Sequence, residues 1–208
     1  MGNPLYIAET VVPYKVSASL GISNLNDWHR FSWMAFPGGK SVRDFLFSVD
    51  EVASGYRVCL MSSSDPGNER LKCLGIVEFR CREIPDAFFR KGEYLFEVVA
   101  NPVRRSATIR DGERIVRKVP ITGEAELISW MDGIASNHGF KVVSLEVELK
   151  GGIRIPRPES SPIVVNSVGF RGTINVENPE LFRSMLQSGI GSSKAFGFGL
   201  VKARPISS

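Results

Sequence analysis

The stretch NPELFRSMLQSGIGSSKAFGFGL, at Asn178–Leu200, contains the capped helix and the glycine-rich turn that decide the fold. Asn178 can cap a helix whose first residue is proline, which predicts a helix over Glu180–Gln187. Four glycines and Lys194 follow, and a strand is predicted over Phe196–Ala203. Because glycine allows positive φ and close backbone approach, this turn can set several N–H groups and one ammonium against an anion. A turn that only reverses the chain is the alternative.

Outward from this stretch, the chain has two halves with the same order of elements. Apolar alternation and helical spacing predict, in the second half, strands at Tyr94–Ala100, Lys141–Leu149 and Ile163–Val176 and a helix over Thr122–Asn137. The first half has strands at Leu5–Val12, Phe45–Val49, Tyr56–Met61 and Gly75–Arg82, a helix from Ser23 or Asn24 to Phe36, and a short helical piece after Asp65. The order β-α-β-β-α-β, met twice, predicts an α+β protein of two tandem ferredoxin-like (RRM-like) domains.

We place these domains at residues 1–87 and 92–208, with a linker over 85–92. The charge differs between them. Residues 1–89 carry nine Lys and Arg against ten Asp and Glu, and residues 90–208 carry seventeen against twelve. The resulting net charges of −1 and +5 favour an anionic partner for the second half, and nucleic acid is the commonest such partner. An α+β sandwich of another topology is the alternative fold.

The composition limits the classes of protein. With 208 residues, 43% of them hydrophobic, the chain is long enough to bury a core. No apolar run approaches the roughly 20 residues that span a bilayer, and no secretory signal is visible, so we expect a cytoplasmic protein with no membrane partner. Three cysteines without a CxxC pair and only two histidines argue against a zinc site of standard spacing.

Two segments place cations on surface projections. Residues 101–120 are expected to form a turn-rich extension with six basic side chains: Arg104, Arg105, Arg110, Arg114, Arg117 and Lys118. Residues 150–162 are expected to form an extended hairpin that carries Arg154 and Arg157. Guanidinium groups suit phosphate oxygens, so we expect both projections to bind phosphates. For any one arginine, a solvated surface position is the simpler interpretation.

Several motifs, taken together, carry a family resemblance. They are WHR from Trp28, RDFLF from Arg43, FEVVANP from Phe96, the helix Glu126–Trp130, GFRG from Gly169 and GIGSSKAFGFGL from Gly189. In this order they cover most of the chain, and it resembles the CasE family of CRISPR repeat-processing endoribonucleases, in the RAMP superfamily. The resemblance implies two ferredoxin-like domains.

The resemblance also implies a function. Family members bind the stem-loop of precursor CRISPR RNA, cut it at the 3′ base of the stem without metal or cofactor, and stay bound to other Cascade subunits. The free protein is then expected to be a monomer. Such cutting uses the adjacent 2′-hydroxyl as nucleophile and leaves a 2′,3′-cyclic phosphate and a 5′-hydroxyl. A non-cleaving RNA-binding or scaffold subunit of a ribonucleoprotein is the alternative.

His29 matches the catalytic histidine of the family, and histidine is the side chain that titrates near neutral pH. Some members have a tyrosine three residues earlier, where this chain has Asn26, which can orient a phosphate or a 2′-hydroxyl but cannot ionise. If His29 acts alone, water or the RNA supplies the second proton-transfer function. We expect Ser192, Ser193 and Lys194 to hold RNA backbone near the cut. His138, at a helix C-terminus where an imidazolium meets the helix dipole, is taken as structural.

Overall fold

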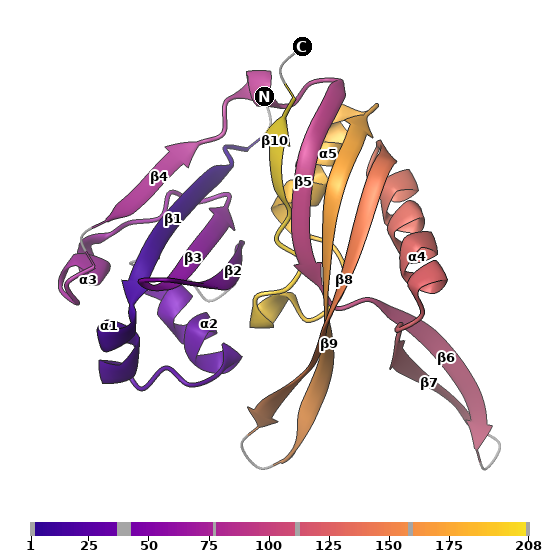
Figure 1. Cartoon of the computed structure of the whole chain (residues 1–208), viewed down its shortest axis with the longest axis horizontal. Helices are drawn as coiled ribbons and strands as arrows, with labels where there is room; N and C mark the ends of the chain where they lie inside the picture. Colours follow the sequence, from indigo (N-terminus) through magenta and orange to yellow (C-terminus); the bar gives the residue numbers. More distant parts are fainter. Residues whose placement is uncertain (1–2, 37–42, 77, 111–112, 158–159, 207–208) are drawn as a thin grey trace.

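The computed structural model describes residues 3–36, 43–76, 78–110, 113–157 and 160–206. Its first half is built on an antiparallel sheet in the order β2-β3-β1-β4. The strands are β1 (Tyr6–Pro13), β2 (Phe45–Val52), β3 (Gly55–Ser62) and β4 (Phe79–Glu83). The connection from β1 to β2 contains α1 (Tyr14–Ser19) and α2 (Leu25–Trp33), and the connection from β3 to β4 contains α3 (Glu69–Lys72). This strand order and connectivity are those of a ferredoxin-like unit (Figure 1).

The second half repeats this arrangement. Its antiparallel sheet has the order β10-β5-β9-β8. The strands are β5 (Gly92–Ala100), β8 (Phe140–Arg157), β9 (Ser160–Val176) and β10 (Lys202–Pro205), and the helices are α4 (Glu124–Asn137) and α5 (Pro179–Ser188). The side chain of Asn178 caps α5 by accepting from two backbone N–H groups. The predicted pair of tandem ferredoxin-like units is confirmed.

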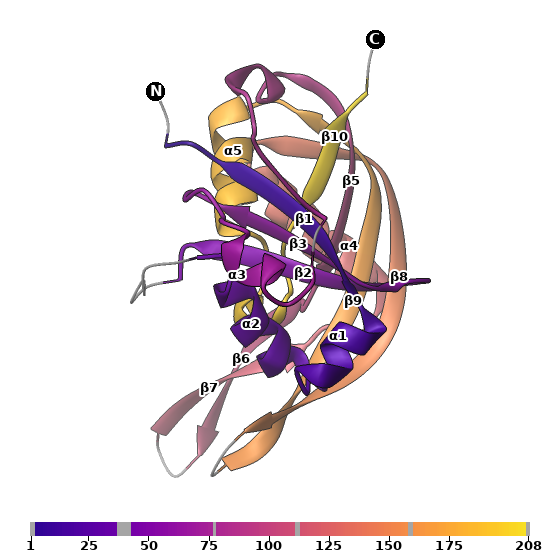
Figure 2. The ribbon, with the colours of Figure 1, turned by 90° about the vertical axis from the view of Figure 1, so that its left-hand side faces the viewer.

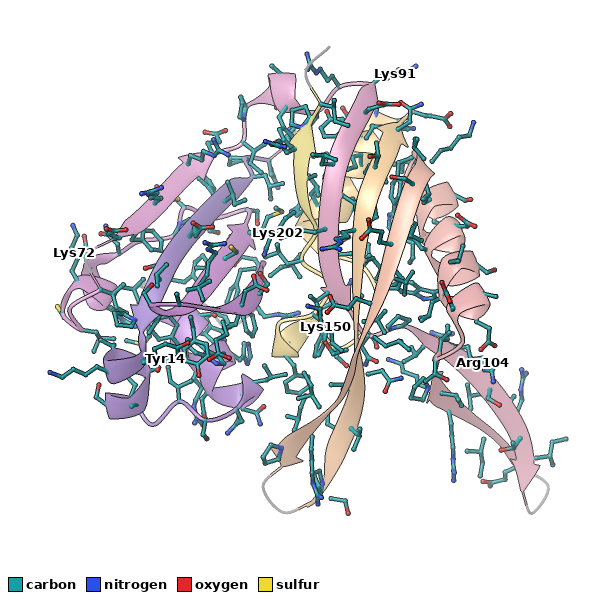
Figure 3. All side chains as sticks on the ribbon, viewed as in Figure 1. Tyr14, Lys72, Lys91, Arg104, Lys150 and Lys202 are labelled. Atoms are coloured by element: carbon teal, nitrogen blue, oxygen red, sulfur yellow. The ribbon has the colours of Figure 1, made fainter. Side chains whose placement is uncertain are left out.

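The largest hydrophobic cluster joins the two halves. Leu46 and Met61 of the first sheet belong to the same cluster as Phe182 of α5. The ammonium of Lys202 on β10, which lies between the halves in Figure 3, is 2.7 Å from Oδ2 of Asp50 on β2. One hydrophobic core therefore contains residues of both sheets. The predicted domain bounds, 1–87 and 92–208, stay a prediction.

Two hairpins project from one end of the molecule. β6 (Val103–Arg110) and β7 (Glu113–Pro120) form a separate two-stranded sheet, and β8 and β9 continue beyond the main sheet as a long twisted hairpin. Figures 1 and 2 both show the hairpins reaching the end of the molecule where α1 and α2 lie. The extended hairpin over 150–162 is therefore confirmed. The turn-rich extension over 101–120 is wrong, because its β-branched residues pair across two regular strands.

Other boundaries also differ from the sequence predictions. β10 begins at Lys202 rather than Phe196, because Ser193 (φ 63°) and Gly197 (φ 83°) are left-handed and the residues between them form a 3₁₀ turn, η2 (Lys194–Phe196). β4 begins at Phe79 rather than Gly75. The predicted linker contains a 3₁₀ turn, η1 (Asp86–Phe88), and α1 was not predicted at all.

Candidate functional site

His29 lies on α2 against aromatic side chains of β2. Its imidazole is stacked on the ring of Phe47, with the ring centroids 6.0 Å apart and the planes at 10°. The ring of Phe45, two residues earlier on the same face of the strand, has its centroid 6.2 Å from that of His29. These contacts orient the imidazole and leave it half-buried.

A hydrogen bond from Trp33 specifies where the imidazole carries its proton. The indole N–H of Trp33, one helical turn further along α2, donates to Nε2 of His29 at 3.2 Å. An acceptor at Nε2 requires the neutral ring to carry its proton on Nδ1. Burial and then the positive charge of Arg43 lower the pKa of His29 from its usual 6.5. His29 is therefore neutral at pH 7, which is the form that accepts a proton.

The glycine-rich turn lies beside this histidine. η2 contacts both α2 and β2. A Cβ added to Gly197 would lie 3.0 Å from Cε2 of Phe47, so glycine is required there both for its φ of 83° and for this close approach. The loop that carries Lys194 thus packs on the ring that supports His29, although the two residues lie near opposite ends of the chain.

Asn101 holds this loop, a role that the amino-acid sequence did not predict. Its buried carboxamide donates from Nδ2 to Oγ of Ser193 at 2.8 Å, and its Oδ1 accepts from the backbone N–H of Asn166 at 3.2 Å. Its carbonyl oxygen accepts from the hydroxyl of Ser192 at 3.0 Å. These bonds hold Ser193 in the left-handed conformation next to Lys194. The motif Ala-Asn-Pro was the available signal, but nothing in it names Ser193 as the partner.

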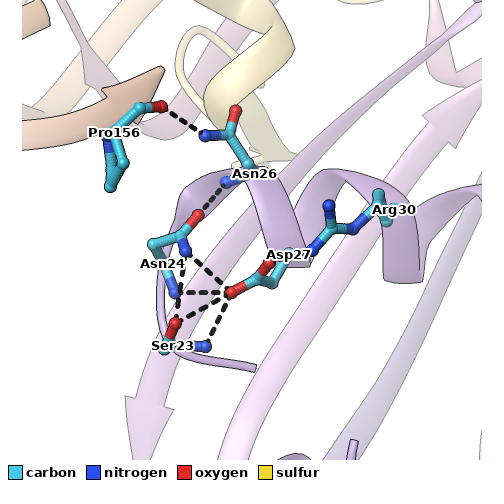
Figure 4. Close-up of polar contacts among 6 residues, drawn as sticks. All are labelled: Ser23, Asn24, Asn26, Asp27, Arg30 and Pro156. Carbon is cyan, nitrogen blue, oxygen red and sulfur yellow. Dashed lines mark hydrogen bonds and ion pairs between the residues drawn. The ribbon is translucent and has the colours of Figure 1, made fainter. Parts of the chain in front are cut away.

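Asn26 connects α2 to the long hairpin. Its Nδ2 donates to the carbonyl oxygen of Pro156 on β8 at 2.9 Å (Figure 4). The hairpin and the helix of His29 are therefore held together by the residue that replaces the tyrosine of some family members. Oδ1 of Asn26 accepts no hydrogen bond from the described residues, so this oxygen can accept one from a ligand.

The start of α2 is closed by a reciprocal cap, also drawn in Figure 4. Oδ1 of Asn24 accepts from the backbone N–H two residues later at 2.9 Å, and Oδ2 of Asp27 accepts from the backbone N–H of Asn24 at 3.1 Å. The backbone N–H of Ser23 donates to the same carboxylate, and this bond is the main reason why the pKa of Asp27 is lowered. Asp27 also pairs with Arg30. The carboxylate is thus used in the cap and in this ion pair.

One face of the β6–β7 hairpin carries closely spaced cations. The register puts Arg105 directly opposite Lys118, and Arg114 lies further along the same face. All three side chains are exposed. Like charges directly opposite each other destabilise a strand pair, so an anion bound between them would stabilise it.

The other cations of the hairpins are placed differently. Arg104, which is labelled in Figure 3, and Arg117 lie on the opposite face. Nη1 of Arg104 is 2.5 Å from Oε1 of Glu126 on α4. This ion pair connects the β6–β7 hairpin to α4. Arg154 is exposed on the outer part of β8. The side chains of Arg110 and Arg157, near the two hairpin tips, lie outside the described residues.

The remaining predictions concern metals, membranes and the second histidine. In the part of the chain that the structure describes, no group of three or more His, Cys, Asp or Glu side chains is placed to hold a metal ion. No helix among the described ranges is long and apolar enough to cross a bilayer. His138 follows α4, but burial lowers its pKa, so the charged form expected to meet the helix dipole is disfavoured.

The fold and the site define a class: tandem ferredoxin-like proteins with a candidate nucleic-acid site. That site combines a neutral histidine beside a glycine-rich loop with two cationic hairpins. A model of the CRISPR associated protein family matches residues 8–205. The chain therefore belongs to the CRISPR associated protein family, and its resemblance to CasE is confirmed by the comparisons with individual proteins.

The chain is similar to two characterised proteins in sequence. It is 25% identical over 201 residues to the CRISPR system Cascade subunit CasE of Escherichia coli K12, a match covering 88% of this chain and 93% of that protein. It is 26% identical over 121 residues to the CRISPR-associated endoribonuclease Cse3 of Thermus thermophilus, covering 53% and 54% of the two chains.

Solved structures have the same fold. Cas6e from Escherichia coli K-12 matches with a TM-score of 0.72 at 21% identity, covering 97% of this chain and 100% of that one. Thermus thermophilus Cse3, bound to an RNA representing a pre-cleavage complex, matches with a TM-score of 0.77 at 20% identity, again covering 97% and 100%.

Proposed function

We propose that this chain is a metal-independent endoribonuclease that cuts precursor CRISPR RNA at the 3′ base of the repeat stem-loop and stays bound within Cascade. The support is similarity to relatives named as a Cascade subunit and as an endoribonuclease. The observation that carries the proposal is that η2, with Lys194, packs on the ring of Phe47 that also stacks on His29. A module that only binds RNA has no need of a neutral imidazole at this point.

In the proposed reaction, Trp33 gives up its hydrogen bond and Nε2 of His29 takes the proton of the 2′-hydroxyl. The 2′-oxygen forms a bond to phosphorus while the bond between phosphorus and the 5′-oxygen breaks. The leaving 5′-oxygen takes a proton from water, and the hydroxide that remains takes the proton from the imidazolium of His29, so the products carry a 2′,3′-cyclic phosphate and a 5′-hydroxyl and the imidazole is neutral again. Lys194 and N–H groups of the loop stabilise the negative charge that develops on the phosphate. Oδ1 of Asn26 is left to accept a hydrogen bond from a ribose hydroxyl.

A cleavage assay in EDTA tests this function. The chain is incubated with its cognate repeat stem-loop, and with the same RNA carrying a single 2′-deoxy nucleotide at the cut. We expect one cut in the all-RNA substrate, with a cyclic phosphate detected by mass spectrometry, and none in the deoxy substrate. Cutting that requires a divalent metal, or that proceeds in the deoxy RNA, would contradict the mechanism. Tight binding with no cutting of either RNA would favour the scaffold alternative.

Replacing both Arg105 and Lys118 by alanine is expected to weaken binding of the stem-loop and flatten its salt dependence. The two opposed cations on the exposed face of β6–β7 should account for about two phosphate contacts, so the slope of log affinity against log salt should fall by about 1.4 to 1.8. Titration of 2′-deoxy RNA at several salt concentrations measures this slope.

The matched control is Arg104→Ala, which removes a cation from the opposite face of the same strand, one that already pairs with Glu126. We expect a smaller change in slope for this variant than for the double variant. Equal slopes for the unaltered chain and the double variant would argue against this face as the phosphate-binding face.

A further inference from the structure

Arg43 has a shielded donor without a partner, and the function proposed so far does not use it. Its Nη1 is inaccessible to solvent and has no hydrogen-bond partner within the described ranges. Leaving such a donor unpaired costs folding free energy, so its presence requires an explanation. Arg43 as a whole is half-exposed and lines an open cavity of about 300 Å³, whose polar walls include Ser63, Ser184 and Gln187, so a ligand can reach the residue from this side.

Arg43 lies just before the strand that supports His29. Phe47 and Phe45 alternate onto one face of this strand, with ring centroids 6.0 Å and 6.2 Å from that of His29. Arg43 is two residues before Phe45, the first residue of β2, and so lies next to the part of the strand that contacts His29. The carboxylate of Asp44, between them, accepts hydrogen bonds from serine hydroxyls just after β3.

The charge of Arg43 acts on both other ionisable members of the site. After burial, it is the second cause that lowers the pKa of His29 and that of Lys194. Lys194 forms no ion pair with any residue in the described part of the chain. Two neighbouring cations of this kind repel each other until an anion binds, and a phosphate suits a guanidinium and an ammonium together.

We propose that Arg43, together with Lys194, binds the phosphate group at which the RNA is cut. The inference rests on the proposed endoribonuclease function and adds a cation from the first half to the loop of the second half. The two groups would hold the non-bridging oxygens from two sides and stabilise the extra negative charge of the transition state. Nη1, shielded and unpaired in the free protein, gains a partner when the half-exposed side chain turns toward the bound phosphate.

The variant Arg43→Met tests this role. We expect single-turnover cutting to be slower by about 100-fold, the loss typical of removing one donor to a developing anion. Arg43→Lys, which keeps a charge, should recover part of that loss. The melting temperature of the free Arg43→Met protein should equal or exceed that of the unaltered chain, because an unpaired, partly buried charge has been removed.

The matched control is Arg57→Met, which replaces an exposed arginine on β3 that lies 3.9 Å from Glu9. Its cutting rate should not change. If Arg43→Met cuts at the unaltered rate, or if its melting temperature falls as it would after the loss of an ion pair, the proposal is overturned.

Binding of a 2′-deoxy stem-loop separates this proposal from the nuclease function. Loss of one phosphate contact in Arg43→Met should reduce the slope of log affinity against log salt by about 0.7 to 0.9, even if the unaltered chain proves unable to cut RNA. An unchanged slope would overturn the Arg43 contact while the nuclease proposal remained intact. If the unaltered chain does not cut RNA but Arg43→Met still has the reduced slope, the nuclease proposal fails and the Arg43 contact stands.

Discussion

Replacing His29 with alanine is expected to slow the cutting of bound stem-loop RNA by about 10²- to 10⁴-fold. The imidazole, stacked on Phe47 and neutral at pH 7, is the proposed acceptor of the 2′-hydroxyl proton, and alanine removes it without removing Lys194 or the hairpin cations. RNA affinity should stay nearly unchanged, because a neutral side chain contributes no charge to phosphate binding. Single-turnover rates at saturating protein measure the first effect, and binding of 2′-deoxy RNA measures the second.

The control is Ser136→Ala, which changes an exposed residue whose hydroxyl donates to a carbonyl oxygen of its own helix, and it should cut at the unaltered rate. The pH dependence is a second check. Burial and Arg43 lower the pKa of His29, so the unprotonated base predominates above pH 6.5, and the rate should fall as the pH drops through the lowered pKa. Unchanged cutting by His29→Ala would falsify the assignment of this residue.

Replacing Asn101 with alanine is expected to lower the free energy of unfolding by about 1–3 kcal/mol, and to slow cutting by about 100-fold. The buried carboxamide holds Ser193 and the backbone N–H of Asn166, and alanine leaves the latter without its acceptor. Without this anchor, Ser193 loses the contact that supports its left-handed conformation, and Lys194 is no longer held near His29. Chemical denaturation and single-turnover cutting measure the two effects.

Asn137→Ala is the matched control, because Asn137 is exposed and its carboxamide, among the described residues, bonds only to a carbonyl oxygen of its own helix. We expect little change in stability or rate. An Asn101→Ala protein that is destabilised but cuts at the full rate would show that the loop reaches its position without this anchor.

The fold was predictable because its signals are local. Alternating apolar residues indicated the strands, and the cap at Asn178 with its proline indicated the last helix before any partner was known. The β6–β7 hairpin was missed because its strands carry so many cations that they look like a solvated loop. The start of β10 was misplaced because the left-handed backbone at Ser193 is imposed by Asn101, which lies far away in the sequence.

The candidate site was only partly predictable. Two ferredoxin-like units, a histidine on a helix at His29 and a glycine-rich turn with a lysine were predictable from the amino-acid order, since each depends on residues close together in the chain. The packing of the turn on Phe47 beside His29, and its anchoring by Asn101, became visible only in three dimensions. The physical reason is that close packing and the pairing of buried polar groups join residues that are distant in the chain, and local sequence patterns carry no record of such partners.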